Sequence, residues 1–556
     1  MDNHSFFMDP TEQESGEHGQ INSRPCWWPA IAILVLLLVG LGVVWRFTVG
    51  NQQERVLKTG GVLIISFVLL TIWALVFSRF TKRIRLRILF SLIGAFALFG
   101  ACFRFDQVSG NMVPIFEWRW AKRSLPEVAD DGQPSGSTDL DSNTTELSFP
   151  QFLGPTRDCK TPGPKLATDW KTNPPKEMWR QDIGAAWSGF VVSAHRAITQ
   201  EQRDENEVVS CYDLLTGKML WIHSNPGHYN TKIAGEGPRA TPAIHEGKVY
   251  TLGATGILNC LELATGKPVW QRNIAFDAGL KIDDEMDQTG AAKKRNKAKE
   301  WGYSSSPLVV EDKVIVSAGG EAGKSLLAYS LETGEPAWAG GNSRTGYSSA
   351  CVATIHGQEQ ILIFNQDGLA AHEPETGSVV WSFKWNPAHP HVSMPVTLGK
   401  NQILLSLGYG NGSKLIQVNQ DGESYSANEL WQSRFMKAKF TNLISHQGHI
   451  YGLDDGILAC IEQEDGRRTW KDGRFGHGQI LIRANHILVM AENGEVILIE
   501  ASPEKQIELS RFDALDSKTW NPHTLAGQYL LVRNHREAAC YKLPLAKTPA
   551  DTPAPE

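Results

Sequence analysis

A short pattern recurs along the chain from residue 208 onward, and it restricts the possible folds more than any other feature. In each copy an apolar run leads to a Thr-Gly or Asp-Gly pair, and a second run then ends at a tryptophan. Glycine adopts the positive φ of a tight turn without steric cost, so each copy is predicted to form a β-hairpin. The five closest copies are 208–221 (VVSCYDLLTGKMLW), 257–270 (ILNCLELATGKPVW), 326–338 (LLAYSLETGEPAW), 369–381 (LAAHEPETGSVVW) and 457–470 (ILACIEQEDGRRTW).

Two further copies are looser, and other β-rich runs lie ahead of the hairpins. Residues 414–431 turn at Asp421-Gly422 and take longer to reach their tryptophan, and residues 496–509 carry Leu509 in its place. The preceding runs include 241–252, 306–317, 442–453 and 480–490. A unit of four antiparallel strands in roughly 40–50 residues is typical of a β-propeller blade.

The ends of the repeat region predict how the ring closes. Residues 522–543 supply three strands and stop, whereas residues 178–180 supply a lone strand, with Trp179, before the first complete unit. If that strand completes the last blade, no sheet edge is left exposed. We therefore predict an all-β, eight-bladed propeller. A seven-bladed ring is the alternative, because the seventh copy lacks its tryptophan.

The repeat units resemble the pyrroloquinoline-quinone (PQQ) repeat, in which a strand leads into a [D/E]-x-x-T-G-K-x-x-W segment. Residues 213–221 and 262–270 match this segment best. Residues 149–158 (FPQFLGPTRD) are similar to the opening segment of BamB-like and PQQ-like propeller proteins. The resemblance covers about residues 149–545 and implies the same architecture.

The resemblance implies two alternative functions. Quinoprotein dehydrogenases of this superfamily hold PQQ and Ca²⁺ at the propeller axis, and alcohol-oxidising members often have adjacent cysteines over the cofactor. BamB-like proteins carry the repeat without the cofactor and are usually held to the outer membrane by a lipid. This sequence has no Cys-Cys pair, and it departs from the BamB-like pattern in its apolar N-terminal segments.

Three apolar segments near the N-terminus, 27–45, 61–77 and 88–103, predict transmembrane α-helices. A helix needs roughly 17–25 residues to cross the hydrocarbon layer, so the first two segments qualify and the third is marginal. Buried core helices are the alternative, but three segments that are apolar on all sides are difficult to place in a soluble core.

Basic residues in the short loops predict the orientation in the membrane, because cytoplasmic loops are enriched in Lys and Arg. The second loop region contains Arg79, Lys82, Arg83, Arg85 and Arg87, and the first contains Arg46, Arg55 and Lys58. We therefore expect a cytoplasmic N-terminus and a propeller outside the cytoplasm. This corresponds to a multi-pass protein of the inner membrane with a periplasmic propeller.

Composition shifts divide the chain into five predicted parts. They are a cytoplasmic tail at 1–26, a membrane domain at 27–105, a linker at 106–148, the propeller at 149–545 and a disordered tail at 546–556.

The 54 Lys and Arg residues are balanced by 60 Asp and Glu residues. No nucleic-acid partner is expected, because such partners require a basic excess.

Residues just ahead of the predicted innermost strands are the candidate binding site. In a propeller these positions face one mouth of the central channel, where aromatic and cationic groups can receive a planar or anionic ligand or a partner's segment. Packing between blades is the alternative role. The candidates are Trp187, Arg239, Trp301, Tyr303, Tyr347, His391, Lys439 and Trp520.

Two other clusters are interpreted as structural. Cys211, Cys260 and Cys460 lie five positions before the turn residue of their repeats, where a small buried side chain is expected instead of disulfide or metal chemistry. The insert at 275–300 carries four acidic residues from Asp283 to Asp287, followed by five Lys and Arg residues. A Ca²⁺ site is conceivable there, but a solvated charged segment is expected.

These observations predict a membrane-anchored, extracytoplasmic scaffold that binds envelope proteins or peptides and has no catalytic activity or cofactor. The alternative is a PQQ-dependent dehydrogenase that uses Ca²⁺ and oxidises an alcohol or sugar. No catalytic or metal-ligating set is evident in the sequence.

Overall fold

The computed structural model describes residues 25–48, 52–121, 124–128, 147–231, 233–279, 301–320 and 322–546. The predicted tails at 1–26 and 546–556 lie almost entirely outside the described residues. So do most of the insert at 275–300 and residues 129–146 of the linker. The chain divides into two compact units. The first is Met1–Arg104 with Glu117–Trp120, and the second is Phe105–Phe116 with Ala121–Glu556.

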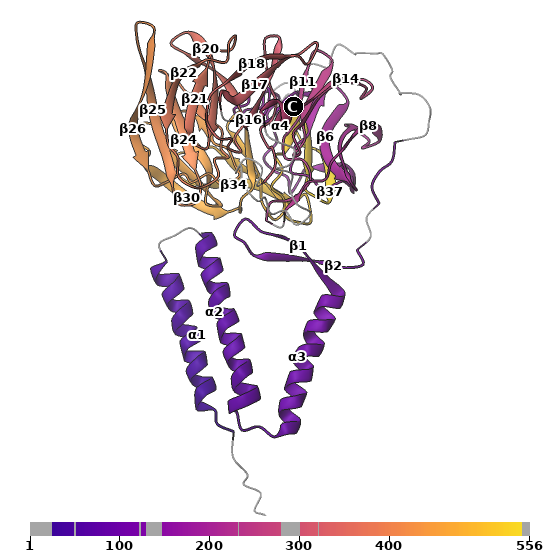
Figure 1. Cartoon of the computed structure of the whole chain (residues 1–556), viewed down its shortest axis with the longest axis vertical. Helices are drawn as coiled ribbons and strands as arrows, with labels where there is room; N and C mark the ends of the chain where they lie inside the picture. Colours follow the sequence, from indigo (N-terminus) through magenta and orange to yellow (C-terminus); the bar gives the residue numbers. More distant parts are fainter. Residues whose placement is uncertain are drawn as a thin grey trace, which may run out of the picture. The chain divides into compact units, whose positions relative to one another are not determined.

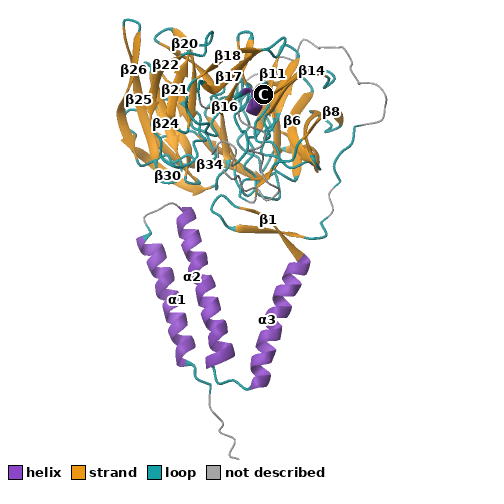
Figure 2. Ribbon diagram, viewed as in Figure 1, coloured by secondary structure: helices purple, strands orange, loops and turns teal. Residues whose placement is uncertain are grey.

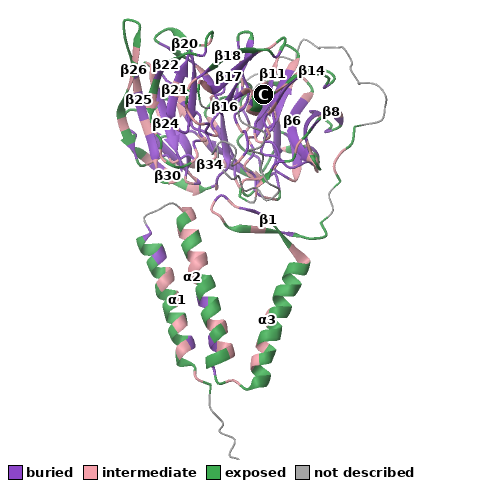
Figure 3. Ribbon diagram, in the orientation of Figure 1, coloured by how far each residue is buried: buried purple, intermediate pink, exposed green. Residues whose placement is uncertain are grey.

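The first unit contains three long helices, labelled in Figure 1. They are α1 (Trp28–Phe47), α2 (Gln52–Ile72), which continues through the π-helical turn η1 (Trp73–Phe77), and α3 (Lys82–Cys102). Each is long and apolar enough to cross a membrane. Their surfaces are mostly exposed, as Figure 3 shows, although they are rich in large apolar side chains. The three predicted membrane-spanning segments are thereby confirmed as helices suited to a lipid environment.

The start of α1 lies beside the loop that precedes α3. The Cys26 N–H donates to the Ser78 carbonyl at 3.2 Å, and the Trp73 indole donates to the Cys26 carbonyl at 3.0 Å. The Trp27, Trp73 and Phe80 rings pack together there, with centroids 5.4–5.9 Å apart. The N-terminal end of α1 therefore lies at the same end of this unit as Arg79 and the start of α3, which agrees with the predicted three-crossing topology. The other basic residues predicted for this loop, Lys82, Arg83, Arg85 and Arg87, form the first turns of α3.

The second unit is a ring of eight sheets, most of them four-stranded, and its strands are drawn in orange in Figure 2. The first blade has β3 (Ser148–Phe149), β5 (Val191–Ser193), β6 (Arg196–Arg203), β7 (Asn206–Asp213) and β8 (Met219–Pro226). The second has β11 (Ala243–His245), β12 (Lys248–Leu252), β13 (Ile257–Glu262) and β14 (Pro268–Asn273). The third has β15 (Leu308–Val310), β16 (Lys313–Gly320), β17 (Lys324–Ser330) and β18 (Pro336–Gly340).

The remaining blades follow the same antiparallel order. The fourth has β19 (Cys351–Ile355), β20 (Gln358–Asn365), β21 (Gly368–His372) and β22 (Val379–Lys384). The fifth has β23 (Val396–Leu398), β24 (Gln402–Leu407), β25 (Gly412–Asp421) and β26 (Ser424–Ser433). The sixth has β27 (Ile444–His446), β28 (His449–Asp454), β29 (Ile457–Glu462) and β30 (Arg468–Arg474). The seventh has β31 (Gln479–Arg483), β32 (His486–Met490), β33 (Glu495–Glu500) and β34 (Ile507–Asp513).

The eighth blade closes the ring with a strand from the other end of the unit. It consists of β35 (Thr524–Ala526), β36 (Tyr529–Arg533) and β37 (Glu537–Lys542), and β4 (Lys176–Asp182) pairs with β37 as the outermost strand. Trp179 lies opposite Cys540 in this pair. The predicted eight blades and the predicted closure by the Trp179 strand are both confirmed. Smaller elements are β9 (Asn230–Thr231), β10 (Gly235–Glu236) and α4 (Ile274–Asp277).

Cysteines 211, 260 and 460 occupy equivalent places in their blades. Each lies opposite the blade tryptophan in the strand pair, beside a β-bulge, and each is fully buried with a free thiol. Burial raises the pKa of the Cys260 thiol to about 11, so this group is neutral at physiological pH. The interpretation of this position as a small buried packing site is confirmed.

Two segments that precede the complete blades, residues 105–116 and residues 147–161, contact opposite ends of the central channel. Residues 147–161 cover one end, where the Ile482 N–H donates to the Cys159 carbonyl at 2.8 Å. At the start of the same strand, β31, the Gln479 side chain instead donates to carbonyls at the other end, those of Phe440 and Trp520. That second end is the mouth at which the candidate site residues were predicted.

A β-hairpin of β1 (Phe103–Val108) and β2 (Pro114–Trp118) lies largely within the range predicted as a linker. Its residues Phe105–Phe116 belong to the same unit as the propeller. The sequence analysis did not identify this hairpin. The domain limits themselves stay predictions.

Candidate binding site at the channel mouth

Three predicted site residues meet at the mouth, where they precede the innermost strands β5, β27 and β35. They are Trp187, Lys439 and Trp520. The centroids of the Trp187 and Trp520 rings are 5.1 Å apart. The Lys518 ammonium nitrogen lies 3.7 Å from the Trp520 centroid and 4.6 Å from that of Trp187, which is a cation–π arrangement.

Phe440 and Glu492 extend this cluster around the mouth. The Phe440 and Trp520 ring centroids are 4.9 Å apart, and Lys439 Nζ lies 5.2 Å from the Phe440 centroid. The Trp520 indole N–H donates to the Glu492 carboxylate at 3.1 Å. Two lysines, one carboxylate and several aromatic faces therefore surround the same space.

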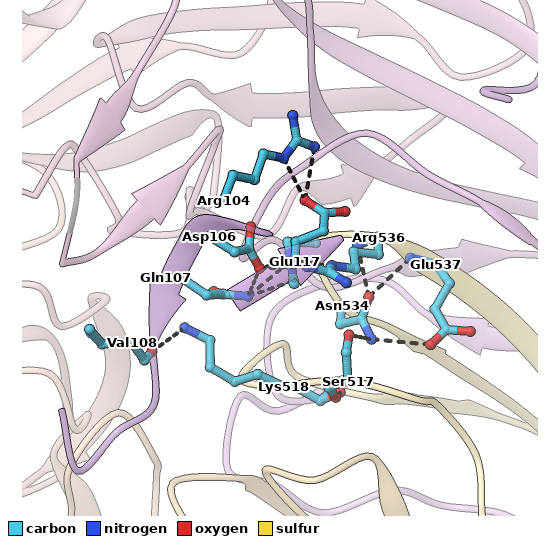
Figure 4. Close-up of polar contacts among 12 residues, drawn as sticks. Arg104, Asp106, Gln107, Val108, Glu117, Ser517, Lys518, Asn534, Arg536 and Glu537 are labelled. Carbon is cyan, nitrogen blue, oxygen red and sulfur yellow. Dashed lines mark hydrogen bonds and ion pairs between the residues drawn. The ribbon is translucent and has the colours of Figure 1, made fainter. Parts of the chain in front are cut away.

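The tip of the β1–β2 hairpin occupies that space. Lys518 Nζ donates to the Val108 carbonyl at 2.8 Å, as Figure 4 shows, and Lys439 Nζ donates to the Gly110 carbonyl at 2.7 Å. The Gly110 N–H donates to Glu492 Oε1 at 2.6 Å. The mouth thus binds polypeptide main chain through charged side chains.

Polar contacts also hold the hairpin farther from its tip. Asp106 Oδ2 lies 2.6 Å from Arg536 Nη2 and 3.2 Å from His535 Nε2, and Gln107 contacts the same histidine at 2.9 Å (Figure 4). Burial alone would raise the pKa of Asp106, but the hydrogen bonds and positive charges of His535 and Arg536 lower it overall. Asp106 is therefore ionised and paired.

Burial at the mouth weakens the basicity of its lysines. It lowers the pKa of Lys518 to about 7 and the pKa of Lys439 to about 8. Burial would raise the pKa of Glu492, but the hydrogen bonds from the backbone N–H groups of Gly110 and His477 help to lower it overall. The carboxylate stays charged at neutral pH, whereas the charge on the lysines depends on pH near neutrality.

Four of the other predicted residues form a second group along the same rim. Arg239 Nε donates to the Trp301 carbonyl at 2.7 Å, and the Trp301 and Tyr347 ring centroids are 5.2 Å apart. The Tyr347 N–H donates to the His391 carbonyl at 2.7 Å. Further guanidinium hydrogen bonds from Arg239 go to the carbonyls of Ala234, Gly235 and Gly237. Arg239 thus links the loop at residues 234–237 to Trp301 by hydrogen bonds to main-chain carbonyls.

Tyr303 and His391 are buried inside the ring. Tyr303 is 3% exposed and belongs to the apolar core between the second and third blades. His391 is fully buried, with its ring centroid 4.4 Å from that of Phe364. Burial lowers the pKa of His391 to about 4, so this ring is neutral at physiological pH.

The sequence analysis missed Phe440, Glu492 and Lys518, and it missed the hairpin tip. Phe440 and Lys518 flank predicted site residues by one and two positions, so a wider window ahead of each innermost strand would have included them. The hairpin also has a local signal, because β-rich runs flank Ser109-Gly110-Asn111. Nothing local marks Glu492, which lies between β32 and β33.

The mouth residues do not fit a bound calcium ion. Ca²⁺ takes six to eight oxygen ligands, largely from carboxylates and carbonyls. Here Lys439 and Lys518 supply positive charge, and Glu492 is the only one of these three side chains that can ligate a cation. Among the described residues, no group of three or more His, Cys, Asp or Glu side chains is placed to hold a metal ion.

Repeat sequence, blade number and channel geometry together define a propeller protein of the PQQ-repeat class. The family described as outer membrane protein assembly factor BamB matches residues 161–292 and 205–472, together more than half of the chain. The chain belongs to this family.

Two relatives match parts of the chain. The outer membrane protein assembly factor BamB of Moranella endobia is 26% identical over 146 residues, which are 23% of this chain and 37% of that protein. The 1-butanol dehydrogenase (cytochrome c) of Thauera butanivorans is 29% identical over 115 residues, which are 20% of this chain and 14% of that enzyme. The chain thus matches well under two thirds of either relative.

Solved structures with a similar course of the chain come from both kinds of protein. BamB from Moraxella catarrhalis is 14% identical, with a TM-score of 0.45 over 67% of this chain and 99% of that one. A europium-containing methanol dehydrogenase is 12% identical, with a TM-score of 0.42 over 70% of this chain and 90% of that one.

Proposed function

We propose that this protein is a membrane-anchored scaffold whose propeller lies outside the cytoplasm and binds polypeptide segments at the channel mouth. The observation that carries the proposal is the way in which the mouth holds the chain's own hairpin. Two buried lysines donate to main-chain carbonyls, and one carboxylate accepts a main-chain N–H. Such charge-assisted hydrogen bonds can be made to any polypeptide that presents the same backbone groups.

Family membership supports a role among envelope proteins. The BamB relative is named as an assembly factor of the outer membrane, and we extend that class of partner to this chain. The helices α1 to α3 would hold the propeller at the membrane without a lipid. The aromatic groups at the mouth are of the residue type that dominates binding hot spots.

A quinoprotein dehydrogenase is the second candidate, and the match to 1-butanol dehydrogenase favours it. The donor set at the mouth weighs against it, because Lys439 and Lys518 replace the oxygen ligands that Ca²⁺ would need. The hairpin backbone also fills the space between these lysines and Glu492.

The test compares mouth variants in the full-length protein, purified from cross-linked membranes. We expect the double variant Lys439→Met, Lys518→Met to lose most co-purifying envelope proteins while its melting temperature changes little. Lys414→Met is the matched control, because Lys414 is also a largely buried lysine but pairs with Glu429 on the fifth blade. Equal recovery with all three proteins would contradict the proposal. A quinone absorption band and dye reduction after incubation with PQQ and Ca²⁺ would favour the dehydrogenase instead.

A further inference from the structure

We propose that the channel mouth selects a tight turn containing glycine, and that the hairpin tip Ser109–Met112 is a built-in competitor which a partner's turn displaces. This inference rests on the proposed scaffold function and specifies the kind of segment that the mouth accepts. It is carried by the shape of the tip, by the environment of Gly110 and by the main-chain character of the contacts.

The tip is a turn whose two ends are joined by hydrogen bonds within the turn itself. The Met112 N–H donates to the Ser109 carbonyl and the Ser109 N–H to the Val113 carbonyl, both at 2.8 Å. The Ser109 hydroxyl accepts the Val113 N–H at 3.1 Å, and Met112 has a φ of +66°. The turn therefore does not depend on the propeller for its backbone pairing, and another chain could present the same shape.

Gly110 lies where no side chain fits. A Cβ atom at this position would lie 1.9 Å from Cδ2 and 2.7 Å from Cγ of the His477 ring. His477 is 1% exposed and its ring packs against Phe440, with centroids 5.9 Å apart, so the ring has little freedom to move away. The mouth consequently discriminates against any residue except glycine at this place in the turn.

The other contacts to the tip discriminate little between side chains of the bound turn, because most of them are made to main-chain atoms. Lys518, Lys439 and Glu492 bind the Val108 carbonyl, the Gly110 carbonyl and the Gly110 N–H. One side-chain contact, from Asn111 Oδ1 to His477 Nε2, is 3.4 Å long. A partner's turn with glycine at the matching position would thus receive the same main-chain hydrogen bonds.

The balance of charges makes the hairpin displaceable. Lys439 and Lys518 are 3% and 6% exposed, and each donates to a neutral carbonyl. Burying these ammonium groups is unfavourable even with the Glu492 carboxylate nearby, and this cost offsets part of what the hydrogen bonds contribute. On the other side of the turn, Val113 is 46% exposed and adds little buried apolar area. The tip and the residue before it are held by three main-chain hydrogen bonds, which a competing turn can make equally well, whereas Asp106 and Gln107 hold the hairpin farther from its tip.

The experiment uses the full-length protein in detergent and a fluorescein-labelled peptide with the sequence of residues 105–116, closed by a disulfide between added terminal cysteines. Fluorescence anisotropy measures its dissociation constant. We expect Gly110→Ala in the protein to free the mouth and tighten peptide binding at least about tenfold, the factor that corresponds to about one lost hydrogen bond. Gly399→Ala is the matched control, because a Cβ there meets no atom within 4 Å.

The peptide tests the selection of glycine directly. The same cyclic peptide with alanine in place of its glycine should bind Gly110→Ala protein at least about tenfold more weakly than the unaltered peptide. Equal binding of the two peptides would overturn the glycine selection. Equal affinity of the wild-type, Gly110→Ala and Gly399→Ala proteins would overturn the competition.

These outcomes are distinguishable from failure of the scaffold function. If Lys439→Met, Lys518→Met protein loses its envelope partners but the peptide binds every protein equally, the scaffold function stands and the glycine-turn inference falls. If neither partners nor peptide depend on these lysines, both proposals fall.

Discussion

Burial sets the protonation state of several histidines that line the propeller ring. It lowers the pKa of His391 and His477 to about 4 and that of His523 to about 3. In an unfolded chain a histidine titrates near pH 6.5. Between these values the unfolded chain binds protons that the folded ring excludes, so stability must fall as the pH decreases from about 6.5 towards 4.

His391→Phe should make the propeller less sensitive to acid. The replacement keeps an aromatic ring against Phe364 but removes the group that must stay neutral. Between pH 7 and pH 4.5 the wild-type protein should lose up to about 2–3 kcal/mol more unfolding free energy than the variant. Urea unfolding followed by tryptophan fluorescence measures this difference. His195→Phe, at an exposed turn, is the control and should lose as much stability as the wild type.

A result in which His391→Phe and wild-type protein lose equal stability on acidification would contradict a neutral, buried His391. It would also remove the reason for assigning this residue to the interior of the ring instead of a titrating binding site.

The blades are joined by a contact between the tryptophan of one blade and the turn glycine of the next. The Trp270 indole N–H donates to the Leu331 carbonyl at 3.0 Å, and its ring lies against Gly334, whose φ is +72°. Equivalent glycines at 217, 266, 377 and 466 lie against tryptophans 179, 221, 338 and 431. In the fifth blade the turn glycine, Gly422, has no such neighbour, and Trp381 of the fourth blade instead donates to Gln360 of its own blade.

Gly334→Ala should destabilise the propeller more than Gly422→Ala. Both glycines have a positive φ, of +72° and +60°, so both substitutions introduce backbone strain of about 1 kcal/mol. Only at Gly334 would the new Cβ meet the next tryptophan, 2.6 Å from a Trp270 ring atom, whereas nothing lies within 4 Å at Gly422. We expect an additional loss of about 1–3 kcal/mol for Gly334→Ala, measured by urea unfolding. Equal losses would show that the contact contributes nothing to joining the blades.

The whole molecule combines a helical membrane unit with a ring that has no open edge. Pairing of β4 with β37 closes the ring, and residues 147–161 cover one end of its channel. At the other end the hairpin tip fills the mouth. Two segments that precede the complete blades, residues 147–161 and the hairpin tip, therefore contact the ring at opposite ends of its innermost strands.

An alkaline phosphatase domain fused after Glu556 should be active, because the basic loop before α3 predicts that the propeller lies outside the cytoplasm. The same domain inserted after Phe80, in that loop, should be inactive and serves as the control. Activity of intact cells towards a membrane-impermeant substrate measures both. Activity only after insertion at Phe80 would reverse the predicted orientation.

Several parts of this fold could be predicted because their signals are local. The turn glycine and the blade tryptophan recur at a similar spacing in five copies and, more loosely, in a sixth, so the predictions of eight blades and of closure by Trp179 could be made from the repeat. The membrane helices are continuous apolar runs and could therefore also be predicted from the sequence. The site was predicted only as a set of positions ahead of the innermost strands, without the contacts that these residues make. Trp187, Lys439 and Trp520 surround the hairpin tip, whereas Tyr303 is part of the core.

The sequence by itself determined the repeat architecture, the ring closure and the membrane-spanning character, since these depend on spacing, turn chemistry and local hydrophobicity. Only the tertiary structure decided what fills the channel mouth. Lys439 and Gly110 are 329 positions apart, and Lys518 and Val108 are 410 positions apart. No periodicity links residues so distant. They meet because the closed ring brings the segments that precede β27 and β35 to one rim with the β32–β33 loop, where Lys439, Lys518 and Glu492 bind the backbone of an earlier segment.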